Sequence, residues 1–392
     1  MRVLFVSSSS GSRGGGEFFL VYLAKALKAE GVEVGLWLSA DPQMDGIVEL
    51  FGDTGPVFRH PYVNTYLRRT RSLSHLLPAG KRLAPIVEQW RSFQPDILHL
   101  NKQCLEDGLD LLEAARRLDL PQGCTLHITQ TAVELKAALG RVRDWVARRA
   151  LRRYPGGIWA IAENRARALQ AFMGGKRAIA CIPNGVRIPT EEEIHRTAAE
   201  CRSQYPHLAE ARGPVAVSVG RLEPQKDPLR FLEIMEAWKA REPGLSALWV
   251  GDGRMRDAFE ERIRAMGAEA WIHCLGWQED ATAFLCLADV YVHPARFEGL
   301  PFALLEAMAR GLPCVISTEL AADLKDMPED LWIPLGEEVA PLVTNLSDRE
   351  FLREKGHRVR EVAVRQFSLE AMARAYIALY EQLLREREAE GS

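Results

Sequence analysis

The sequence predicts an α/β protein made of two doubly wound domains, each a parallel sheet covered by helices on both faces. Short β-branched and apolar runs alternate with longer helical patterns, and this alternation starts afresh at residue 214. The length of 392 residues also exceeds what one hydrophobic core usually organises. We therefore expect one domain over 1–188 and a second over 189–367.

The first domain begins with a strand in "RVLFVSSS" (2–9), followed by a glycine-rich turn. An amphipathic helix is predicted over 16–31, because apolar residues recur at helical spacing and Gly31 follows as a stop signal. Further strands are expected, between helices, in the runs "VEVGLWL", "DILHL", "TLHIT" and "GIWAIA".

The second domain repeats the pattern from "PVAVSVGRL" (214–222), with later strands in "LSALWVGDG", "AWIHCLGW", "DVYVHPA" and "PCVIST". The polar segment 184–213, with an Asn-Gly turn and an acidic cluster, is the expected linker and start of this domain. A last helix is predicted over 368–392, with Ser368 available as its N-cap.

The composition is that of an ordinary soluble globular protein, with 47% hydrophobic and 26% charged residues. No run approaches the roughly 18 apolar residues that cross a membrane, and the apolar run at the N-terminus is too short for a signal peptide. We expect a cytoplasmic protein. No two of the seven cysteines lie within ten residues of each other, so they predict small buried side chains instead of a metal knuckle or a disulfide framework.

The net charge of −3 divides unevenly along the chain. Residues 1–195 hold 26 Lys and Arg against 20 Asp and Glu, whereas residues 196–392 hold 24 against 33. Positive charge gathers in the segments 66–82 and 136–153. No nucleic-acid partner is expected.

Segment 136–153 has the pattern of a basic amphipathic helix, with Leu139, Val142, Val146 and Leu151 among seven basic residues. A solvated helix that packs its apolar side on its own domain is the interpretation we favour. The alternative is that the basic segments 66–82 and 136–153 form a surface for anionic lipid or a polyanionic acceptor, which would associate the protein peripherally with the inner face of a membrane.

The glycine-rich turn lies where an open parallel sheet binds ligands, outside the carboxyl end of a strand. Gly14, Gly15 and Gly16 let backbone N–H groups approach an anion at a helix start, where the dipole favours negative charge. The spacing is neither G-x-G-x-x-G nor a P-loop. A glycine triplet alone is more often a flexible turn.

Two cations stand at the equivalent place in the second domain. Arg221 and Lys226, in "VSVGRLEPQKDP" (217–228), directly follow a predicted strand. A guanidinium fork and an ammonium group suit a diphosphate. Taken by themselves, they would be interpreted as solvated loop residues.

Two acids flank an apolar stretch in "FEGLPFALLEAMARGLPCV" (297–315). Glu298 precedes a predicted helix whose start Pro301 marks, and Glu306 lies within that helix. Without further context, such a pair would be two exposed carboxylates about two turns apart.

In combination these segments resemble the retaining glycosyltransferases of the GT-B fold, in family four. The matching pieces occur in the family's order over residues 2–380. They are the glycine-rich loop, "TLHIT" with His127, "IPNGV", "GRLEPQKD", "VGDGRMRD", "LGW", the Glu-x7-Glu stretch and a closing helix with tyrosine. The resemblance implies two Rossmann-like domains facing across a cleft, with the C-terminal helix crossing back to the N-terminal domain.

The resemblance also implies transfer of a sugar from a nucleotide sugar, with retention and with no metal or other cofactor; the sequence has no Asp-x-Asp triplet. Glu306 would bind the ribose hydroxyls and Glu298 the hydroxyls of the donor sugar. Arg221 and Lys226 would stabilise the departing diphosphate. Other residues expected at the donor are His127, Gly15, Gly16, Gly299, Leu300 and Pro301.

The sequence departs from the family beside the donor. Segment 319–327 lacks the family's usual glycines, and "EGLP" stands in place of the frequent "EGFG". A UDP-hexose or UDP-N-acetylhexosamine is favoured over GDP-mannose. The acceptor is expected to be a glycan, a lipid-linked saccharide or an anionic small molecule, and the basic and aromatic segment 59–80 is expected to border the cleft and to move.

Three other classes of protein are alternatives to a glycosyltransferase. A nucleotide-sugar epimerase shares this architecture but needs acid–base residues of its own, which the sequence does not identify. An NAD-dependent oxidoreductase needs the dinucleotide glycine fingerprint and a ribose-binding acid about 20 residues further on, and neither is present in that form. A catalytically silent binding protein is disfavoured, because the cations, both glutamates and the histidine are all present.

Overall fold

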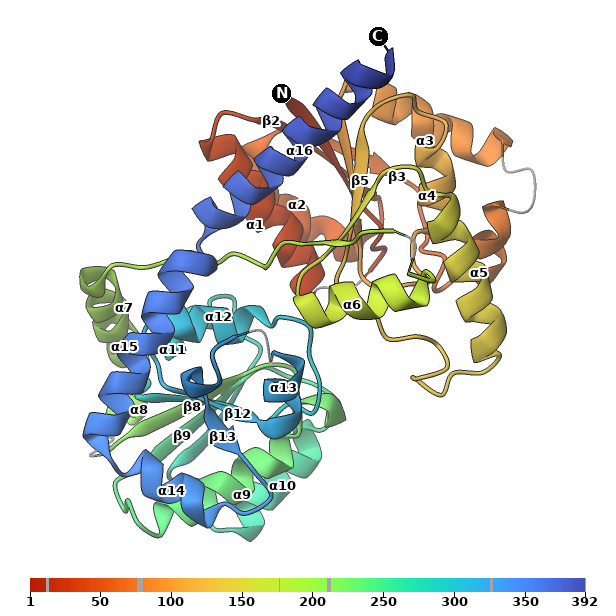
Figure 1. Ribbon diagram of the computed structural model, residues 1–392. Helices are drawn as coiled ribbons and strands as arrows, with labels where there is room; N and C mark the ends of the chain where they lie inside the picture. The colour runs from red at the N-terminus through yellow and green to blue at the C-terminus, as the bar shows by residue number, and fades with distance from the viewer. Residues whose placement is uncertain (12–13, 76–79, 176, 210–212, 325–326, 392) are drawn as a thin grey trace. The chain divides into compact units, whose positions relative to one another are not determined.

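The chain forms two compact units. The computed structural model describes residues 1–11, 14–75, 80–175, 177–209, 213–324 and 327–391. Unit 1 comprises Met1–Gly185 and Leu369–Ser392, and unit 2 comprises Val186–Ser368 (Figure 1). The expected domain boundary, after residue 188, lies close to the division after Gly185.

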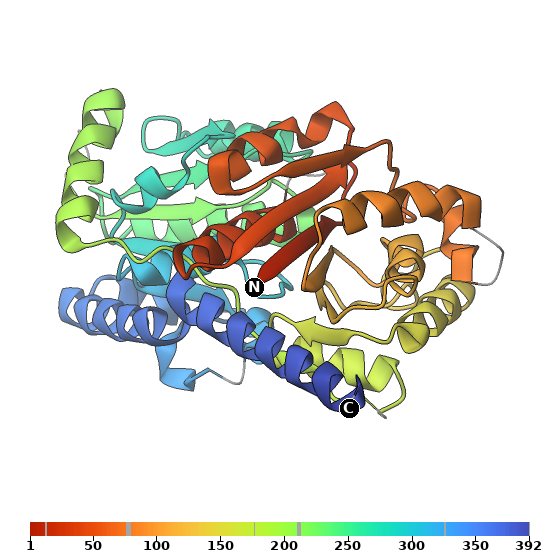
Figure 2. The ribbon, with the colours of Figure 1, turned by 90° about the horizontal axis from the view of Figure 1, so that it is seen from above.

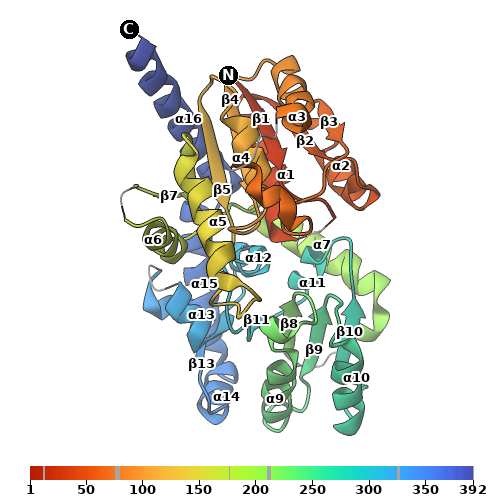
Figure 3. The ribbon, with the colours of Figure 1, turned by 90° about the vertical axis from the view of Figure 1, so that its right-hand side faces the viewer.

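Unit 1 contains a seven-stranded sheet in the order β3-β2-β1-β4-β5-β6-β7. Every neighbouring pair is parallel, and Figure 3 shows β5, β4, β1, β2 and β3 side by side. The chain leaves β1 in one direction across the sheet and resumes at β4 in the other. The strands are β1 (Arg2–Ser7), β2 (Glu33–Ser39), β3 (Val57–His60), β4 (Ile97–Lys102), β5 (Gln122–Leu126), β6 (Gly157–Ala160) and β7 (Ala180–Cys181).

Unit 2 repeats this topology with six parallel strands in the order β10-β9-β8-β11-β12-β13. The order now reverses between β8 and β11. The strands are β8 (Val215–Val219), β9 (Ser246–Val250), β10 (Ile272–Gly276), β11 (Val290–His293), β12 (Cys314–Ser317) and β13 (Ile333–Leu335). The predicted class of two doubly wound α/β domains is confirmed.

Helices connect the strands in both units. Those of unit 1 are α1 (Gly15–Ala29), α2 (Asp45–Phe51), α3 (Gly80–Ser92), α4 (Leu109–Ala115), α5 (Gly140–Arg153), α6 (Glu163–Phe172) and α16 (Leu369–Gly391), with 3-10 turns η1 (Pro42–Met44), η2 (Gly52–Thr54) and η3 (Arg69–His75). Those of unit 2 are α7 (Glu191–Gln204), α8 (Pro206–Ala209), α9 (Pro228–Lys239), α10 (Arg256–Ala265), α11 (Thr282–Leu285), α12 (Phe302–Ala309), α13 (Thr318–Asp323), α14 (Ala340–Leu346) and α15 (Arg349–Gln366), with turns η4 (Pro224–Lys226) and η5 (Glu329–Leu331).

One local expectation needs correction. The strand expected in "TLHIT" is β5, which starts earlier and ends at Leu126, because its ladder with β4 stops at the pair Lys102–Leu126. Unit 2 begins within the polar segment 184–213, which includes the helices α7 and α8. Thr190 and Glu193 form a reciprocal capping box at the start of α7, and the acidic cluster occupies the first turn of this helix, where negative charge is favourable.

Helix α16 completes the core of unit 1. It lies beside α1 in Figures 1 and 2. The hydroxyl of Tyr380 is 2.6 Å from Nδ1 of the buried His99, and Tyr376 bonds Thr125 at 3.0 Å. Phe19 on α1 packs edge-to-face on Tyr376. The last helix is therefore part of the first unit's interior.

Across the part of the chain that the structure describes, no helix has both the length and the apolar character that crossing a membrane requires. All seven cysteines are free thiols; Cys124, Cys201 and Cys314 are buried, and the other four are partly buried.

Candidate functional site

Both sheets reverse their strand order at a point where loops leave the carboxyl ends of neighbouring strands, β1 and β4 in unit 1, and β8 and β11 in unit 2. Such switch points are where open α/β sheets bind ligands. Gly15 and Gly16 follow β1, and Arg221 and Lys226 follow β8. Glu298 and its neighbours follow β11. The predicted residues thus cluster at the two switch points.

The loop after β8 is held by close backbone contacts. A Cβ atom at Gly251 would overlap with the carbonyl of Gly220, and one at Gly253 would lie 2.5 Å from the carbonyl of Leu222. The N–H of Leu222 donates to the carbonyl of Asp252 at 3.0 Å. The "VGDG" glycines therefore form a turn that supports the loop carrying Arg221 and Lys226.

Lys226 and Glu298, predicted from separate motifs, form an ion pair in the structure. Their side chains are 15% and 14% exposed, so water screens the pair less than it would at the surface. The loops that carry them are tied together, because Gln225 Nε2 donates to the carbonyl of Phe297 at 2.9 Å and the Arg296 N–H donates to the carbonyl of Gln225.

Arg221 lies in the same loop as Lys226 but takes no part in the ion pair with Glu298. Its side chain is exposed, and within the described residues its guanidinium has no ion pair or hydrogen bond. Arg221 is thus available to a ligand at the surface of this loop, whereas Lys226 is already engaged.

Helix α12 starts where the sequence predicts. Pro301 is its N-cap, and its carbonyl accepts from the N–H groups of Leu304 and Leu305 at 3.1 and 3.2 Å. Leu300 is buried and anchors this start. Glu306 is partly buried on the helix, and burial raises its pKa to about 7, although the charge of Arg310 opposes the shift.

His293, at the end of β11, is a candidate residue that sequence reasoning missed. It is buried, its Nδ1 is 2.8 Å from the hydroxyl of Tyr291, and its Nε2 is 3.9 Å from Oε1 of Glu298. Burial, and then the charge of Lys226, lower its pKa well below the ordinary value. The sequence feature that could have indicated His293 is its position as a polar residue at the carboxyl end of the predicted strand in "DVYVHPA".

In unit 1, His127 directly follows β5 and is buried. Its Nε2 is 2.7 Å from Oδ1 of Asn101 at the end of β4, and Asn101 Nδ2 donates to the carbonyl of Gly16 at 2.8 Å. Phe19 packs edge-to-face on the imidazole, with the ring centroids 4.8 Å apart. Burial lowers the pKa of His127 to about 4, so it is neutral at pH 7.

Gly15 and Gly16 open α1, with Gly15 exposed and Gly16 buried. A Cβ atom at Gly16 would overlap with the side-chain amide of Gln103, so a glycine is what lets the two loops approach. Residues 12–13 of the glycine-rich turn lie outside the described residues.

A second buried polar group, also missed, lies beside this loop. Lys102 and Asp107 form an ion pair at 3.0 Å with both side chains 1% exposed, and Asp107 also accepts from the hydroxyl of Ser8. Asn64 Nδ2 donates to the carbonyl of Ser8 at 2.8 Å. Lys102 directly follows Asn101 at the end of β4, a position that the carboxyl-end rule marks.

The same contact ties part of segment 59–80 to the carboxyl end of β1, because Asn64 belongs to it. Tyr66 and Leu67 in this segment are exposed, and residues 76–79 lie outside the described residues. Whether the segment moves stays a prediction.

The basic segment 136–153 contains α5, which packs Val146 and Leu151 into the core of unit 1. Leu139 and Val142 are 76% and 57% exposed, so the apolar residues divide between two faces. Leu139 also has a positive φ of 56°, a strained conformation for a residue with a side chain. The helix thus packs on its own domain, as favoured, and still presents apolar side chains to solvent.

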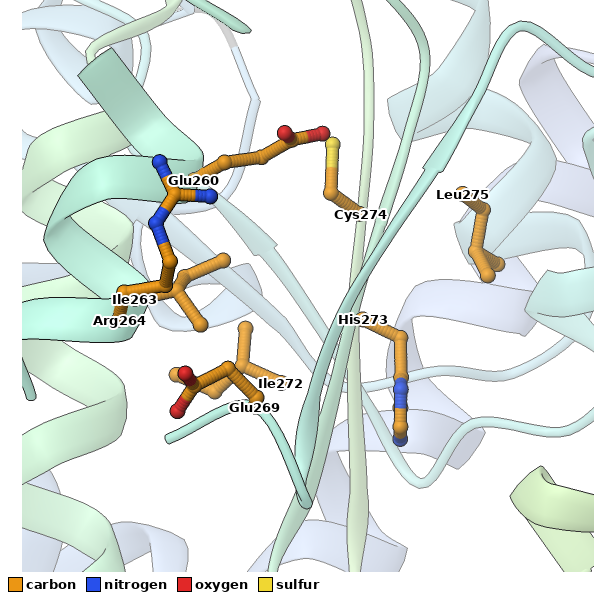
Figure 4. A pocket seen from close by; sticks show the side chains of 8 residues that line it. All are labelled: Glu260, Ile263, Arg264, Glu269, Ile272, His273, Cys274 and Leu275. Carbon is orange, nitrogen blue, oxygen red and sulfur yellow. The ribbon is translucent and has the colours of Figure 1, made fainter. Parts of the chain in front are cut away.

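An open cavity of about 320 Å³ lies elsewhere in unit 2, between α10 and the edge strand β10 (Figure 4). Ile272 and Cys274 point from the strand towards α10, whereas His273 and Leu275 point to the opposite face. None of the predicted site residues lines it.

Comparison with known proteins identifies the fold and the family. The family described as "Glycosyltransferase Family 4" matches residues 13–188, and the family "Glycosyl transferases group 1" matches residues 213–348. Anabaena Alr3699/HepE, solved in complex with UDP, is similar with a TM-score of 0.74 and 19% identity, over 97% of this chain and 100% of that one. Sucrose-phosphate synthase from Thermosynechococcus elongatus gives a TM-score of 0.73 at 19% identity, over 98% and 99%. The fold is thus GT-B.

Curated relatives match over shorter regions. A lipopolysaccharide core biosynthesis glycosyltransferase, LpsE of Rhizobium meliloti, is 32% identical over 216 residues, which cover 53% of this chain and 59% of that protein. A UDP-Gal:alpha-D-GlcNAc-diphosphoundecaprenol alpha-1,3-galactosyltransferase of Escherichia coli is 37% identical over 106 residues, 26% of this chain and 27% of that protein. The matches thus span only part of these relatives. The chain belongs to the group 1, family 4 glycosyltransferases.

Proposed function

We propose that this protein transfers a sugar from a nucleoside diphosphate sugar to an acceptor hydroxyl, with retention at the anomeric carbon. The observation that carries the proposal is the meeting of Lys226 and Glu298 beside the start of α12, on which Glu306 also lies, in a chain of this family. Folding brings together a cation for phosphate and two acids for hydroxyl groups at one switch point.

The cations would bind the diphosphate. A phosphate competes with Glu298 for the Lys226 ammonium, and the exposed Arg221 adds a guanidinium fork. Gly299, Leu300 and Pro301 lead into α12, whose N-terminal dipole favours negative charge. Once Lys226 turns to the phosphate, Glu298 can accept hydrogen bonds from sugar hydroxyls, and Glu306 from those of the ribose.

In the transfer step the bond between the anomeric carbon and the phosphate oxygen breaks, and its electron pair stays on the phosphate. The acceptor oxygen bonds to that carbon on the same face, and the acceptor's proton passes to the departing phosphate. Lys226, Arg221 and the helix dipole stabilise the negative charge that develops. Because Lys226 and Arg221 already supply positive charge, we propose that the reaction needs no metal or other cofactor.

On the unit 1 side, we propose that His127 contacts a hydroxyl of the substrate sugar and that Gly15 and Gly16 let the backbone approach the substrate. His127 is neutral and oriented by Asn101 and Phe19. Its part is therefore to bind and orient a sugar hydroxyl.

The donor we propose is a UDP-hexose or a UDP-N-acetylhexosamine. The E. coli relative is named as a UDP-Gal-dependent galactosyltransferase, and the Anabaena neighbour was solved with UDP and with UDP-glucose. These names support UDP over GDP-mannose. None of the relatives and neighbours described above supports the epimerase alternative.

We further propose that the acceptor is lipid-linked or lies at an anionic membrane surface. Segment 128–149 contains six exposed apolar side chains, the exposed cations Lys136, Arg141 and Arg149, and the exposed acid Glu134. Exposed apolar side chains interspersed with basic ones are typical of peripheral membrane contact. The six side chains are those of Ile128, Val133, Leu135, Leu139, Val142 and Trp145.

The test of the activity has two stages. Thermal shift against UDP, GDP, ADP and TDP should show the largest stabilisation with UDP. Labelled UDP-sugars with a panel of acceptors should then give product with the donor's anomeric configuration, read by NMR. A sugar that is changed but not transferred would support an epimerase, and a nucleotide sugar that is bound but never transferred or hydrolysed would leave a binding protein.

The membrane contact is tested by flotation with phosphatidylglycerol or phosphatidylcholine vesicles. We expect binding to the anionic vesicles only, weakened at high salt and lost in Leu139→Ser/Trp145→Ser. Val364→Ser, at an exposed apolar residue of α15 in unit 2, is the matched control. Equal binding by both variants, or none by the wild type, would contradict the proposal.

A further inference from the structure

Asn101 has both ends of its side chain engaged. It is fully buried at the end of β4, with Nδ2 2.8 Å from the carbonyl oxygen of Gly16 and Oδ1 2.7 Å from Nε2 of His127. These two hydrogen bonds lie in series and join three segments of unit 1.

The backbone carbonyl of Gly16 determines which group donates and which accepts in both hydrogen bonds. A carbonyl oxygen can only accept, so the group of Asn101 that faces Gly16 must be its NH₂. The amide oxygen then faces the imidazole, and since that oxygen can only accept, Nε2 of His127 must carry a hydrogen. The reversed amide would bring two oxygens together and is excluded.

We propose that Asn101 is a positioning residue that holds His127 as the neutral Nε2–H tautomer, so that the bare Nδ1 accepts a hydrogen bond from a substrate hydroxyl. This inference rests on the proposed function for the identity of the hydroxyl, but the tautomer itself does not. Within the described residues Nδ1 of His127 has no hydrogen-bond partner.

The surroundings keep the imidazole neutral. Burial is the main cause that lowers the pKa of His127 to about 4, and the charge of Asp107 opposes it only in part. His99 on β4 is also neutral at pH 7, and Lys102 pairs with Asp107. Phe19 restricts rotation of the ring by edge contact. Both the proton count and the ring orientation are therefore fixed.

A bare ring nitrogen selects its partner, because it can only accept. A sugar hydroxyl can donate to it, whereas a carboxylate would meet it lone pair to lone pair and a deoxy position would leave it without a partner. The inference therefore narrows the donor to neutral sugars with a hydroxyl at the contacted position, and it disfavours hexuronic acids and deoxy sugars there.

The experiment reads the tautomer directly by ¹⁵N NMR of protein labelled at histidine, with the signals of His127 assigned from their absence in His127→Gln. We expect a protonated Nε2 and an unprotonated Nδ1 at pH 7. Asn101→Leu should shift these signals towards a tautomer mixture, and Asn101→Gln, which keeps an amide oxygen for Nε2–H and an NH₂ for the carbonyl of Gly16, should shift them less. Asn345→Leu, at an exposed position of α14, should change nothing.

Two results would overturn the inference: a protonated Nδ1 in the wild type, or signals of His127 that Asn101→Leu leaves unchanged. With an active enzyme, Asn101→Leu should lower kcat at least tenfold, and a UDP-hexuronate should be a far poorer donor than the matching UDP-hexose. The NMR measurement needs no substrate. If it showed the expected tautomer while no nucleotide sugar gave transfer, the result would contradict the proposed function but not the role of Asn101.

Discussion

The two units share one topology but equip it differently. Each sheet reverses its strand order once and gathers polar residues there. In unit 1 these are Asn101 and His127, neutral groups hydrogen-bonded to each other, with the fully buried ion pair of Lys102 and Asp107 beside them. In unit 2 they are Lys226 and Glu298, opposite charges that pair with each other. The fold decides where chemistry can occur, and the side chains decide which kind.

The comparison extends to charge. The half of the chain with excess negative charge, residues 196–392, carries the lysine and arginine we assign to phosphate, whereas the positive half contributes a neutral histidine. Net charge over a domain therefore does not indicate the charge of its site.

Burial shifts pKa values in both units, and the shifts of histidines and of Glu306 have opposite effects on stability. Burial lowers the pKa of His99 and His127 in unit 1 to about 3 and about 4, and it raises that of Glu306 in unit 2 to about 7. Both shifts favour the neutral form. As the pH rises from 4.5 to 6.5, the histidines therefore add stability to the fold while Glu306 removes it.

The largest expected effect is that of Lys226→Ala, which removes the cation that pairs with Glu298 in unit 2. We expect UDP affinity to fall about 100-fold or more, because a charged hydrogen bond to phosphate is lost from a partly buried position. Calorimetry measures it. Arg221→Ala, at an exposed position, should cost less than tenfold, and equal losses in the two variants would contradict the roles assigned to them.

The next effect is in the pH dependence of donor binding. The ionised carboxylate of Glu306 can accept from both ribose hydroxyls, so affinity for a UDP-sugar should rise roughly tenfold between pH 6 and pH 8, across its pKa of about 7. Glu306→Gln should remove most of this rise in affinity. Any pH dependence that comes from titration of the ligand itself would remain in both proteins. Parallel pH profiles for the two would count against the role of Glu306.

A third effect concerns stability in acid. The pKa of His99 lies near 3 in the fold and near 6.5 in the unfolded chain, so its contribution is complete above pH 6.5 and is lost as the pH falls towards 3. His99→Gln can still bond Tyr380 and Thr125. It should reduce the loss of unfolding free energy between pH 6.5 and pH 5 by about 2 kcal/mol, measured by urea denaturation; an unchanged loss would refute it.

The smallest effect is steric. Gly16→Ala should destabilise the protein by about 1 to 2 kcal/mol, because the new methyl group meets the amide of Gln103. Gln103→Ala in the same chain should recover most of this. Gly336→Ala, where nothing lies within 4 Å, is the neutral control. If the losses of stability from the two substitutions simply added in the double variant, the clash with Gln103 would not be the cause.

Much of the fold could be predicted because strand periodicity is local. The strands around both switch points were found, whereas β3, β7 and β13, of four, two and three residues, were missed. So short a run leaves little periodic signal. The strand β5 lies three residues earlier in the chain than the predicted "TLHIT", because its pairing with β4 sets where it begins and ends. The sequence of one segment does not contain that pairing.

Site residues that belong to a sequence motif could be predicted. The contacts between them, and site residues outside any motif, could not. Glu298 and Lys226 were each marked by sequence, but their ion pair depends on two loops bonded through Gln225. Asn101 and His293 have no motif of their own, and only their place at a strand end distinguishes them. The role of Asn101 follows from the two groups it touches.

The position of α16 has a consequence for how the protein is made on the ribosome. The aromatic residues around His99 need Tyr376 and Tyr380 from the last 24 residues of the chain. Unit 2, Val186–Ser368, emerges before them and has its ends tied together by the bond from Val186 N–H to the carbonyl of Phe367. The domain translated second can therefore finish folding first, while the nascent N-terminal half waits, with an apolar surface open, for its final helix.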